Sequence, residues 1–358
     1  MFPALIKGRN LVPLIGLIVV FGVIAIITTL LGVPLLNRLV TVMFIDLILV
    51  LGLQLFMGNS GILSFAHVGF MGIGAYASAV FSIPVAVKAT ALPDLYPALA
   101  AIELGFVPAM LCGAVIAAIV AAVVGYPLMR LSDSAAAIAS FALLVIVHVV
   151  LSQWSAVTNG PRTLFGLLKY TDLWTAVMWG LVIIAVTFLF KLSPLGMKLR
   201  ASRDNVHAAA AIGINVINAR WIAFIFSAFI CGMAGALWAH FITSFAPGSF
   251  YLAQTFVLLT MLIVGGPRTV VGASLGVLIV TITHEGLRYF ENSFSLSQIL
   301  PFETVGMTEI LLAVFLIFML AFRPGGIVQT VEWGSMRFRR KASTESLTGQ
   351  VVGGGTDD

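Results

Sequence analysis

From Trp221 to Pro267 the chain contains 47 consecutive residues without an Asp, Glu, Lys or Arg side chain. Only 9% of the 358 residues are charged, whereas 60% are hydrophobic. A soluble domain carries a charge on about 25% of its residues. The sequence therefore predicts a polytopic membrane protein, and it limits the function to transport, channel conduction or a reaction within the membrane.

Eight apolar segments meet or approach the length of about 20 residues that a helix needs to cross a bilayer. These segments are residues 11–32, 36–57, 62–87, 105–129, 135–153, 173–190, 220–242 and 304–322. They lack the alternating pattern of an outer-membrane β-strand, so we expect an all-α fold. Residues 253–284 allow a re-entrant pair of half-helices broken at 265–268, or two complete short spans. The fold class is therefore eight transmembrane helices plus a re-entrant pair, or ten transmembrane helices.

The basic residues predict that both termini are cytoplasmic. Lys7 and Arg9 precede the apolar run 11–32, which is too long for the core of a cleavable signal peptide and is expected to remain as the first span. Alternating the spans from there places Arg130, the basic cluster within residues 191–220 and the basic tail in the cytoplasm.

The composition divides the chain into two parts. Residues 1–330 hold all the predicted spans and form a transmembrane domain, whereas residues 331–358 are predicted to be a cytoplasmic, largely disordered tail. Cys112 and Cys231 both fall within apolar spans, so we expect small core residues and no disulfide.

The longest polar interruption is the loop of residues 191–219. Ser202 or Asp204 can cap a short helix there, the alanines 208–211 favour it, and Gly213 suits the left-handed residue that follows a helix. A rigid cytoplasmic helix gives a soluble partner an element to push on. A solvated connector whose arginines set the membrane orientation is the competing interpretation.

Several separated motifs resemble the permeases of ATP-driven (ABC) importers. His207-Ala208-Ala209 followed by Gly213 is close to their EAA-x3-G loop, with His207 in place of the glutamate. Further stretches resemble the LivM-like permease family of branched-chain amino-acid ABC importers, over about residues 40–330. These stretches are residues 58–61, 63–67, 70–76, 193–201, 213–215, 227–236, 265–266 and 322–326. Coupling to an ATPase, by this resemblance, involves Arg200, Arg203, Asp204, His207, Ala208, Ala209 and Gly213.

The resemblance implies a permease subunit that brings branched-chain or related amino acids into a bacterial cell through its plasma (inner) membrane. The implied partners are a second related permease, two cytoplasmic ATP-binding subunits, an extracytoplasmic substrate-binding protein and the lipid bilayer, with no nucleic acid. The chain has no G-x4-G-K-[ST] phosphate loop, so we expect ATP hydrolysis in partner subunits and no catalytic residues here. No cofactor or metal site is predicted, because the histidines lack metal-ligand spacing.

Residues 58–78 alternate glycine with serine and alanine, which predicts close helix packing or a bent helix. The functional interpretation is the wall of a substrate path, with Ser64, His67 and Tyr76 as its polar groups and Asp46 as a fourth candidate. The competing interpretation is packing alone, in which His67 is a hydrogen-bonded core residue.

Two pairs of small residues, Gly232/Ala236 and Gly272/Gly276, predict further faces where helices approach closely. These faces serve packing within the subunit or contact with the sister permease, and the sequence does not separate the two.

Asp46 lies near the middle of a predicted span, and Glu309 lies a turn or two inside the last one. Carboxyl groups within a membrane usually face the bundle interior. We expect Asp46 to be protonated, or paired with a donor such as Gln54 or a histidine. The alternatives are a stand-alone proton-coupled transporter using Asp46 and, within the family, a urea or short-amide permease. An intramembrane enzyme ranks last, because no catalytic constellation has a readable spacing.

Overall fold

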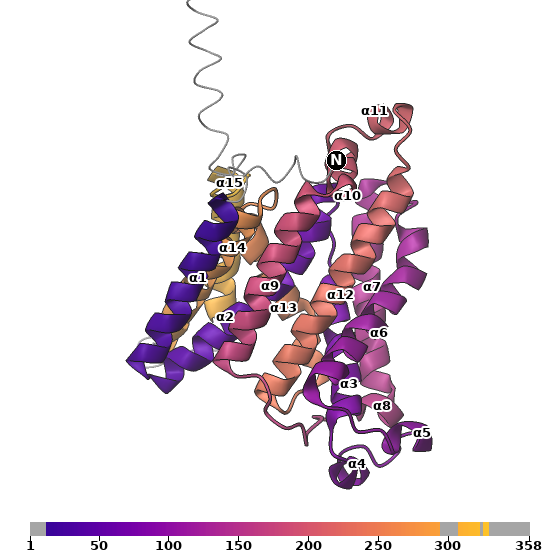
Figure 1. The fold of residues 1–358 in the computed structure, drawn as a ribbon, viewed down its shortest axis with the longest axis vertical. Helices are drawn as coiled ribbons and strands as arrows, with labels where there is room; N and C mark the ends of the chain where they lie inside the picture. Colours follow the sequence, from indigo (N-terminus) through magenta and orange to yellow (C-terminus); the bar gives the residue numbers. More distant parts are fainter. Residues whose placement is uncertain (1–11, 294–306, 323–324, 329–358) are drawn as a thin grey trace, which may run out of the picture.

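The computed structural model describes residues 12–293, 307–322 and 325–328, which are helical along most of their length (Figure 1). Within them the β-structure amounts to one isolated bridge between Leu164 and Phe245. Eight helices, counting η2 with α2 and η3 with α13, are long and apolar enough to cross a membrane. The predicted all-α polytopic fold is confirmed. Lys7, Arg9 and the predicted tail, residues 331–358, lie outside the described residues.

The helices match the predicted spans at most positions. In chain order they are α1 (Val12–Leu31), α2 (Pro34–Leu53), the π-helical turn η2 (Gln54–Gly58), α3 (His67–Ser82), α4 (Val85–Ala91), α5 (Pro97–Ala100), α6 (Phe106–Leu128), α7 (Asp133–Gln153), α8 (Ser155–Thr158), α9 (Leu173–Leu192), α10 (Pro194–Asp204), α11 (Val206–Ala211), α12 (Val216–Ile242), the 3-10 turn η3 (Pro247–Phe250), α13 (Leu252–Gly265), α14 (Val270–Ser293) and α15 (Met307–Phe322).

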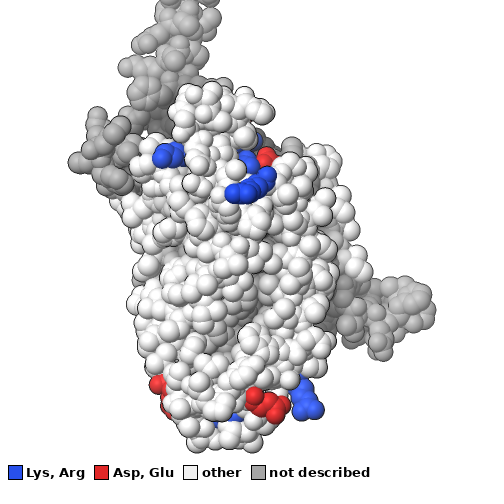
Figure 2. Space-filling model, turned by 90° about the vertical axis from the view of Figure 1, so that its right-hand side faces the viewer, with Lys and Arg blue, Asp and Glu red and all other residues white. Residues whose placement is uncertain are grey.

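The molecule has two ends, and charges gather at both of them. We call the end that carries α10 and α11 the inner end, because it is predicted to face the cytoplasm, and the end that carries α4, α5 and α8 the outer end (Figure 1). Figure 2 shows charged side chains at the top and bottom of one face and none across its middle. A charge-free belt between two charged ends is the surface expected of a chain surrounded by lipid.

The third predicted span, residues 62–87, is wrong at both ends. Residues 61–66 are not helical, and α3 runs only from His67 to Ser82. Gly61 has a φ of 79°, a left-handed conformation that glycine adopts without steric cost, so the preceding helix ends before it. After Gly61, the backbone N–H groups of Ile62 and Phe65 donate to Ser60 Oγ (3.2 Å) and Ser140 Oγ (3.1 Å) rather than to helix carbonyl groups. Pro84 follows α3 closely and starts the separate short helix α4.

The α13–α14 pair favours ten spans over a re-entrant pair. α14 has 24 residues and is about 36 Å long at 1.5 Å per residue, enough to cross the hydrocarbon core. The turn between the two helices lies at the inner end, since Gln54 Nε2 donates to the carbonyl oxygen of Pro267 (3.4 Å). The break between α13 and α14 therefore lies near the inner end of the bundle, beside Gly58 and α10. The eight long helices together with α3 and α15, each of 16 residues, correspond to the ten-helix alternative.

Glycines bring the core helices into backbone contact. A Cβ atom on Gly74 of α3 would overlap the backbone of Gly232 in α12, and one on Gly235 would overlap the Met71 carbonyl. Gly265 in α13 meets Gly272 and Gly276 of α14 in the same way. The two predicted packing faces therefore join helices within this chain.

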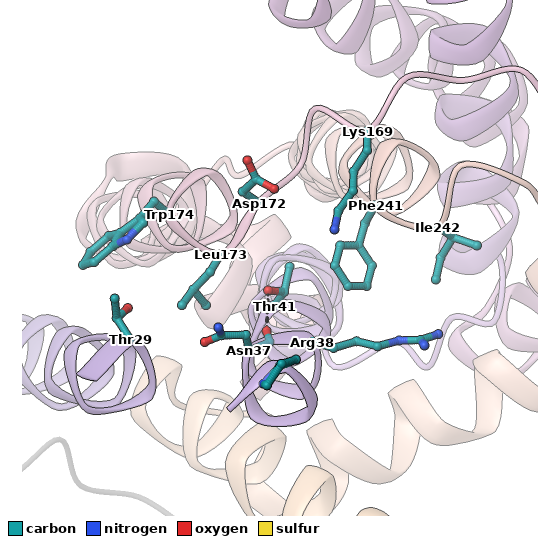
Figure 3. Close-up of a pocket in the computed structure, with 11 residues that line it drawn as sticks. Thr29, Asn37, Arg38, Thr41, Lys169, Asp172, Leu173, Trp174, Phe241 and Ile242 are labelled. Atoms are coloured by element: carbon teal, nitrogen blue, oxygen red, sulfur yellow. Dashed lines mark hydrogen bonds between the residues drawn. The ribbon is translucent and has the colours of Figure 1, made fainter. Parts of the chain in front are cut away.

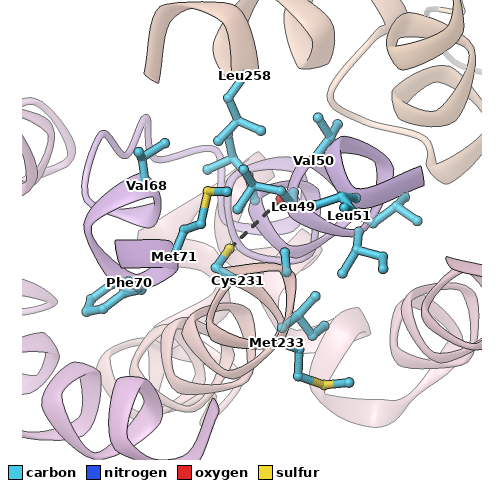
Figure 4. Close-up of a cluster of buried hydrophobic side chains, with 14 of the residues drawn as sticks. Leu49, Val50, Leu51, Val68, Phe70, Met71, Cys231, Met233 and Leu258 are labelled. Carbon is cyan, nitrogen blue, oxygen red and sulfur yellow. Dashed lines mark hydrogen bonds between the residues drawn. The ribbon is translucent and has the colours of Figure 1, made fainter. Parts of the chain in front are cut away.

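Apolar side chains fill the space between α2, α3, α12 and α13. Figure 4 shows Leu49, Met71, Cys231 and Leu258 within this cluster, where Cys231 Sγ lies 3.9 Å from the Leu49 carbonyl oxygen. Cys112 and Cys231 are both free thiols, as predicted. α2 is the most enclosed of the long helices, since every residue from Met43 to Leu53 is buried.

A buried lysine stabilises the short helices of the outer end through hydrogen bonds. Lys88 Nζ donates to the carbonyl oxygens of Leu99 (3.1 Å) and Ile102, so it ties α4 to the chain beyond α5. Glu103 accepts a hydrogen bond from the Val85 backbone N–H (3.0 Å). Burial lowers the pKa of the Lys88 ammonium, and the nearby Glu103 carboxylate opposes that shift.

Candidate coupling loop, transport path and outer cavity

The predicted coupling loop folds into two short helices rather than one. Ser193 caps α10, since its Oγ accepts from the Gly196 N–H (3.2 Å). Asn205 caps α11, since its Oδ1 accepts from the Ala208 N–H (3.0 Å). The caps predicted at Ser202 or Asp204 are wrong, because the extended backbone of Asn205 ends α10 and starts α11. Asparagine caps a helix as well as serine or aspartate does, so residue type alone does not show which of Ser202, Asp204 and Asn205 is the cap.

The end of α11 follows the prediction. Gly213 has a φ of 84°, and its N–H donates to the Ala210 carbonyl oxygen (2.9 Å). The next N–H, of Ile214, reaches back to Ala209 (3.1 Å). These bonds satisfy carbonyl groups at the helix end, which is the role of a left-handed residue there.

α11 projects from the inner end (Figure 1), and five of its six residues are exposed. Of the predicted coupling residues, Asp204, His207, Ala208 and Gly213 are exposed, whereas Ala209 is buried. Ile212 is 75% exposed.

The two arginines of α10 are half-buried and bond to backbone carbonyl groups of this chain, and Arg203 also pairs with Asp204 (3.4 Å). Arg203 Nη1 donates to the Gly58 carbonyl oxygen (2.7 Å), and a Cβ atom on Gly61 would lie 2.7 Å from Arg203 Cγ. Arg200 Nη2 donates to the Lys191 carbonyl oxygen (3.0 Å) and so fixes the bend between α9 and α10. We expected both arginines to contact a partner. The sequence could not predict these internal hydrogen bonds, because it does not show which distant carbonyl group a guanidinium reaches.

Three segments meet at the inner end of α2. Gly58 ends η2, accepts the bond from Arg203, and lies so close to Pro267 that a Cβ atom would overlap the Pro267 carbonyl oxygen. Residues 327 and 328 join the same turn, since their N–H groups donate to Val264 (2.9 Å) and Gly265 (3.1 Å). α10, the end of α2 and the α13–α14 turn therefore form one tightly packed junction, which we call the inner junction.

The candidate path residues are all buried, but they do not line one common cavity. Ser64 lies in the non-helical segment before α3, and its Oγ has no hydrogen-bond partner among the described residues. His67 packs between the rings of Phe56, Phe70 and Phe224, at centroid distances of 5.6 to 6.1 Å. Neither ring nitrogen of His67 has a partner in the described part of the chain. The structure thus places His67 in an aromatic core.

Tyr76 lines a separate apolar cavity of about 460 Å³ between α3, α6 and α7. Its ring packs on Phe245 and Phe250, at centroid distances of 5.0 and 6.0 Å. Neither this cavity nor the outer cavity described below is lined by Ser64, His67 or Asp46. The path assignment of these residues stays a prediction.

Asp46 is 8% exposed and pairs with Gln254 of α13, whose Nε2 donates to Asp46 Oδ1 (3.3 Å). The predicted pairing with a donor is right in kind, but Gln54 binds Pro267 instead. Glu309 lies in the first turn of α15, and its side chain is outside the described residues.

A second cavity, of about 660 Å³, lies at the outer end above the first turns of α2 (Figure 3). Side chains from α1, α2, α9, α12 and the segment before α9 surround it, among them Arg38, Lys169 and Asp172. Sequence reasoning missed this outer cavity, since its residues come from distant parts of the chain and form no local motif.

Comparison with known proteins decides the family. Residues 35–321 match the sequence model of the family described as the permease component of the branched-chain amino acid transport system. The chain belongs to this family. Since this is a transporter family, the chain is a multi-pass inner-membrane permease and not a member of an enzyme family.

Individual relatives agree. The chain is 26% identical to the high-affinity branched-chain amino acid transport system permease protein LivM of Escherichia coli, over 80% of this chain and 68% of LivM. LivM of Salmonella typhimurium gives the same identity and coverage. A probable LivM of Methanocaldococcus jannaschii is 26% identical over 38% of this chain and 40% of its own length. No solved structure matches the chain.

Proposed function

We propose that this chain is the permease subunit that carries branched-chain or related amino acids inward in an ATP-driven importer. Its partners are a second related permease, two cytoplasmic ATP-binding subunits and an extracytoplasmic substrate-binding protein. The family supports the class of transporter, and the relatives named LivM support the class of substrate.

The single observation that carries the coupling role is the hydrogen bond from Arg203 Nη1 to the Gly58 carbonyl oxygen. The exposed residues Asp204, His207 and Ala208 and the helix end at Gly213 form the surface that the ATPase contacts. Arg203 passes a displacement of α10 to the end of α2 and to the non-helical residues 61–66. A charge-assisted bond of this kind is about twice as strong as a neutral one, so the two elements move together.

The bundle is the two-state element in this proposal. Closure of the ATP-binding subunits pushes α11, and the inner junction shifts α2 and α3 between outward-open and inward-open arrangements. Arg200 acts as a positioning residue, since its bond to the Lys191 carbonyl oxygen keeps α10 at a fixed angle to α9.

The function is tested in proteoliposomes that contain the chain, its sister permease and the ATP-binding subunits, with the substrate-binding protein outside. We expect accumulation of labelled leucine only when ATP is inside, and competition by unlabelled isoleucine and valine but not by urea. Vesicles with this chain alone should accumulate nothing.

Two results contradict the proposal. Competition by urea alone indicates the short-amide alternative. Uphill leucine accumulation by the chain without ATPases, driven by a pH gradient, indicates the proton-coupled alternative that uses Asp46.

A further inference from the structure

The outer cavity carries charges of both signs that do not neutralise one another. Arg38 on α2 and Lys169 before α9 supply two cations, and Asp172 supplies one carboxylate. None of the three forms an ion pair with a residue in the described part of the chain. Lys169 Nζ instead lies 5.6 Å from the centroid of the Phe241 ring, which also lines the cavity.

The floor of the outer cavity is polar and enclosed. Thr41 is 2% exposed, and its Oγ1 donates to the backbone carbonyl oxygen of Asn37 (2.6 Å), so the hydroxyl oxygen is left as an acceptor. The Oδ1 atom of Asn37 has no hydrogen-bond partner among the described residues. This oxygen lies beside the outer cavity, so a donor group of a polar ligand bound there would supply the missing hydrogen bond.

The remaining wall is apolar. Leu173 and Trp174 of α9 line one side, and Phe241 and Ile242 of α12 line the other (Figure 3). A volume of about 660 Å³ lies within the usual range for small-molecule sites, about 300–1,000 Å³. The outer cavity thus combines separated positive and negative groups with an aliphatic and aromatic wall.

We propose that the outer cavity binds a free aliphatic amino acid as its zwitterion, an inference that rests on the proposed function. Arg38 and Lys169 hold the α-carboxylate, Asp172 holds the α-ammonium group, and the wall of Phe241 and Ile242 receives the branched side chain. A neutral amide leaves all three charges without a counter-charge. An inorganic anion faces the repulsion of the Asp172 carboxylate.

The position of the outer cavity fits a site that receives substrate from an extracytoplasmic binding protein. It lies at the outer end, beside the first two turns of the most enclosed helix, α2. The charged side chains are exposed, so the site is hydrated and its ion pairs are weak. Weak binding suits a transport site, because the solute must leave it again.

The test uses the full chain in phosphatidylglycerol nanodiscs and saturation-transfer NMR with three probes. L-leucine carries both charges, L-leucinamide lacks the carboxylate, and 4-methylpentanoate lacks the ammonium group. We expect leucine to bind the wild type about threefold to fivefold more tightly than either analogue, as exposed ion pairs allow.

Single substitutions of the charged residues should change which of the three probes bind. Arg38→Gln should weaken leucine and 4-methylpentanoate but not leucinamide, whereas Asp172→Asn should weaken leucine and leucinamide but not 4-methylpentanoate. Arg162→Gln is the matched control, because Arg162 is an exposed arginine in the segment between α8 and α9 that does not line the outer cavity. Equal binding of the three probes, or equal effects of all three variants, overturns the proposal.

A zwitterionic lipid headgroup shares the chemistry of an amino acid, so a second arm separates the two. Adding phosphatidylethanolamine to the nanodiscs should leave leucine binding unchanged. Two results would assign the outer cavity to lipid and contradict the proposal. One is loss of leucine binding when phosphatidylethanolamine is added, and the other is retention of this lipid by the wild type but not by Arg38→Gln.

The proposed function and this site fail in different ways. Leucine accumulation by the assembled importer that Arg38→Gln and Asp172→Asn leave intact rejects the site and keeps the function. Leucine binding with the predicted charge dependence, without ATP-driven accumulation, keeps the site and rejects the function.

Discussion

The two ends of α2 differ in how tightly they are packed. At the inner end, Gly58 is pressed against Pro267 and holds Arg203 through its carbonyl group. At the outer end, Asn37 and Arg38 border a cavity of about 660 Å³ with unpaired charges. One end leaves no room for an added methyl group, and the other leaves room for a ligand.

This difference assigns separate tasks to one helix. Close packing transmits displacement, because a packed junction cannot deform without moving its neighbours. An open polar cavity can bind a ligand, but its loosely packed walls do not transmit a displacement. The enclosed middle of α2 connects the two, so a movement at the inner junction reaches the outer cavity through a single rigid element.

The largest effect is expected from Gly58→Ala. The added Cβ atom would overlap the Pro267 carbonyl oxygen, and backbone cannot move aside as a flexible side chain can. Overpacking of this kind costs about 1–3 kcal/mol, so thermal unfolding of the purified chain should occur at a clearly lower temperature.

Gly16→Ala is the matched control, since Gly16 is also a helical glycine but has no atom within 4 Å of a Cβ position. Alanine favours a helix over glycine by up to about 1 kcal/mol, so this variant should be unchanged or slightly more stable. Equal unfolding temperatures for the two variants mean that the inner junction is not tightly packed.

The smallest effect is expected from Asp46→Asn, halfway between the ends. Asparagine keeps an oxygen that accepts the bond from Gln254, so a structural role predicts uptake within about twofold of the wild type at every pH. ATP-driven leucine uptake in proteoliposomes at several pH values measures this. Loss of uptake, or loss of its pH dependence, makes Asp46 a proton carrier.

The predictable part of the fold is the part set by composition along the chain. Hydrophobic length alone placed the ends of α1, α6, α7 and α9 within a few residues. It failed at the start of α3, because residues 62–66 are mostly apolar and were counted in the span, whereas their backbone is not helical and the Phe65 N–H donates to the distant Ser140. In a stretch with several glycines, the sequence does not show which glycine adopts the left-handed conformation.

In the coupling loop, too, local features could be predicted from the sequence and long-range contacts could not. The left-handed Gly213 follows from local chemistry and was predicted. The direction of Arg203 depends on a carbonyl group 145 residues away in the chain, which no local pattern contains. The outer cavity was missed for this reason as well, because Arg38, Lys169 and Asp172 come together only through the packing of α2 with α9.

The most direct test of the central claim, that α10 drives α2 through Arg203, is the ratio of leucine transported to ATP hydrolysed in Arg203→Met proteoliposomes. The account predicts that hydrolysis continues while uptake falls by about tenfold, the effect of losing about 1.4 kcal/mol of coupling. Arg130→Met is the control, since within the described residues the Arg130 side chain contacts the nearby Tyr126 and bonds to no distant helix, so this variant should keep the wild-type ratio. A wild-type ratio in Arg203→Met would contradict the account.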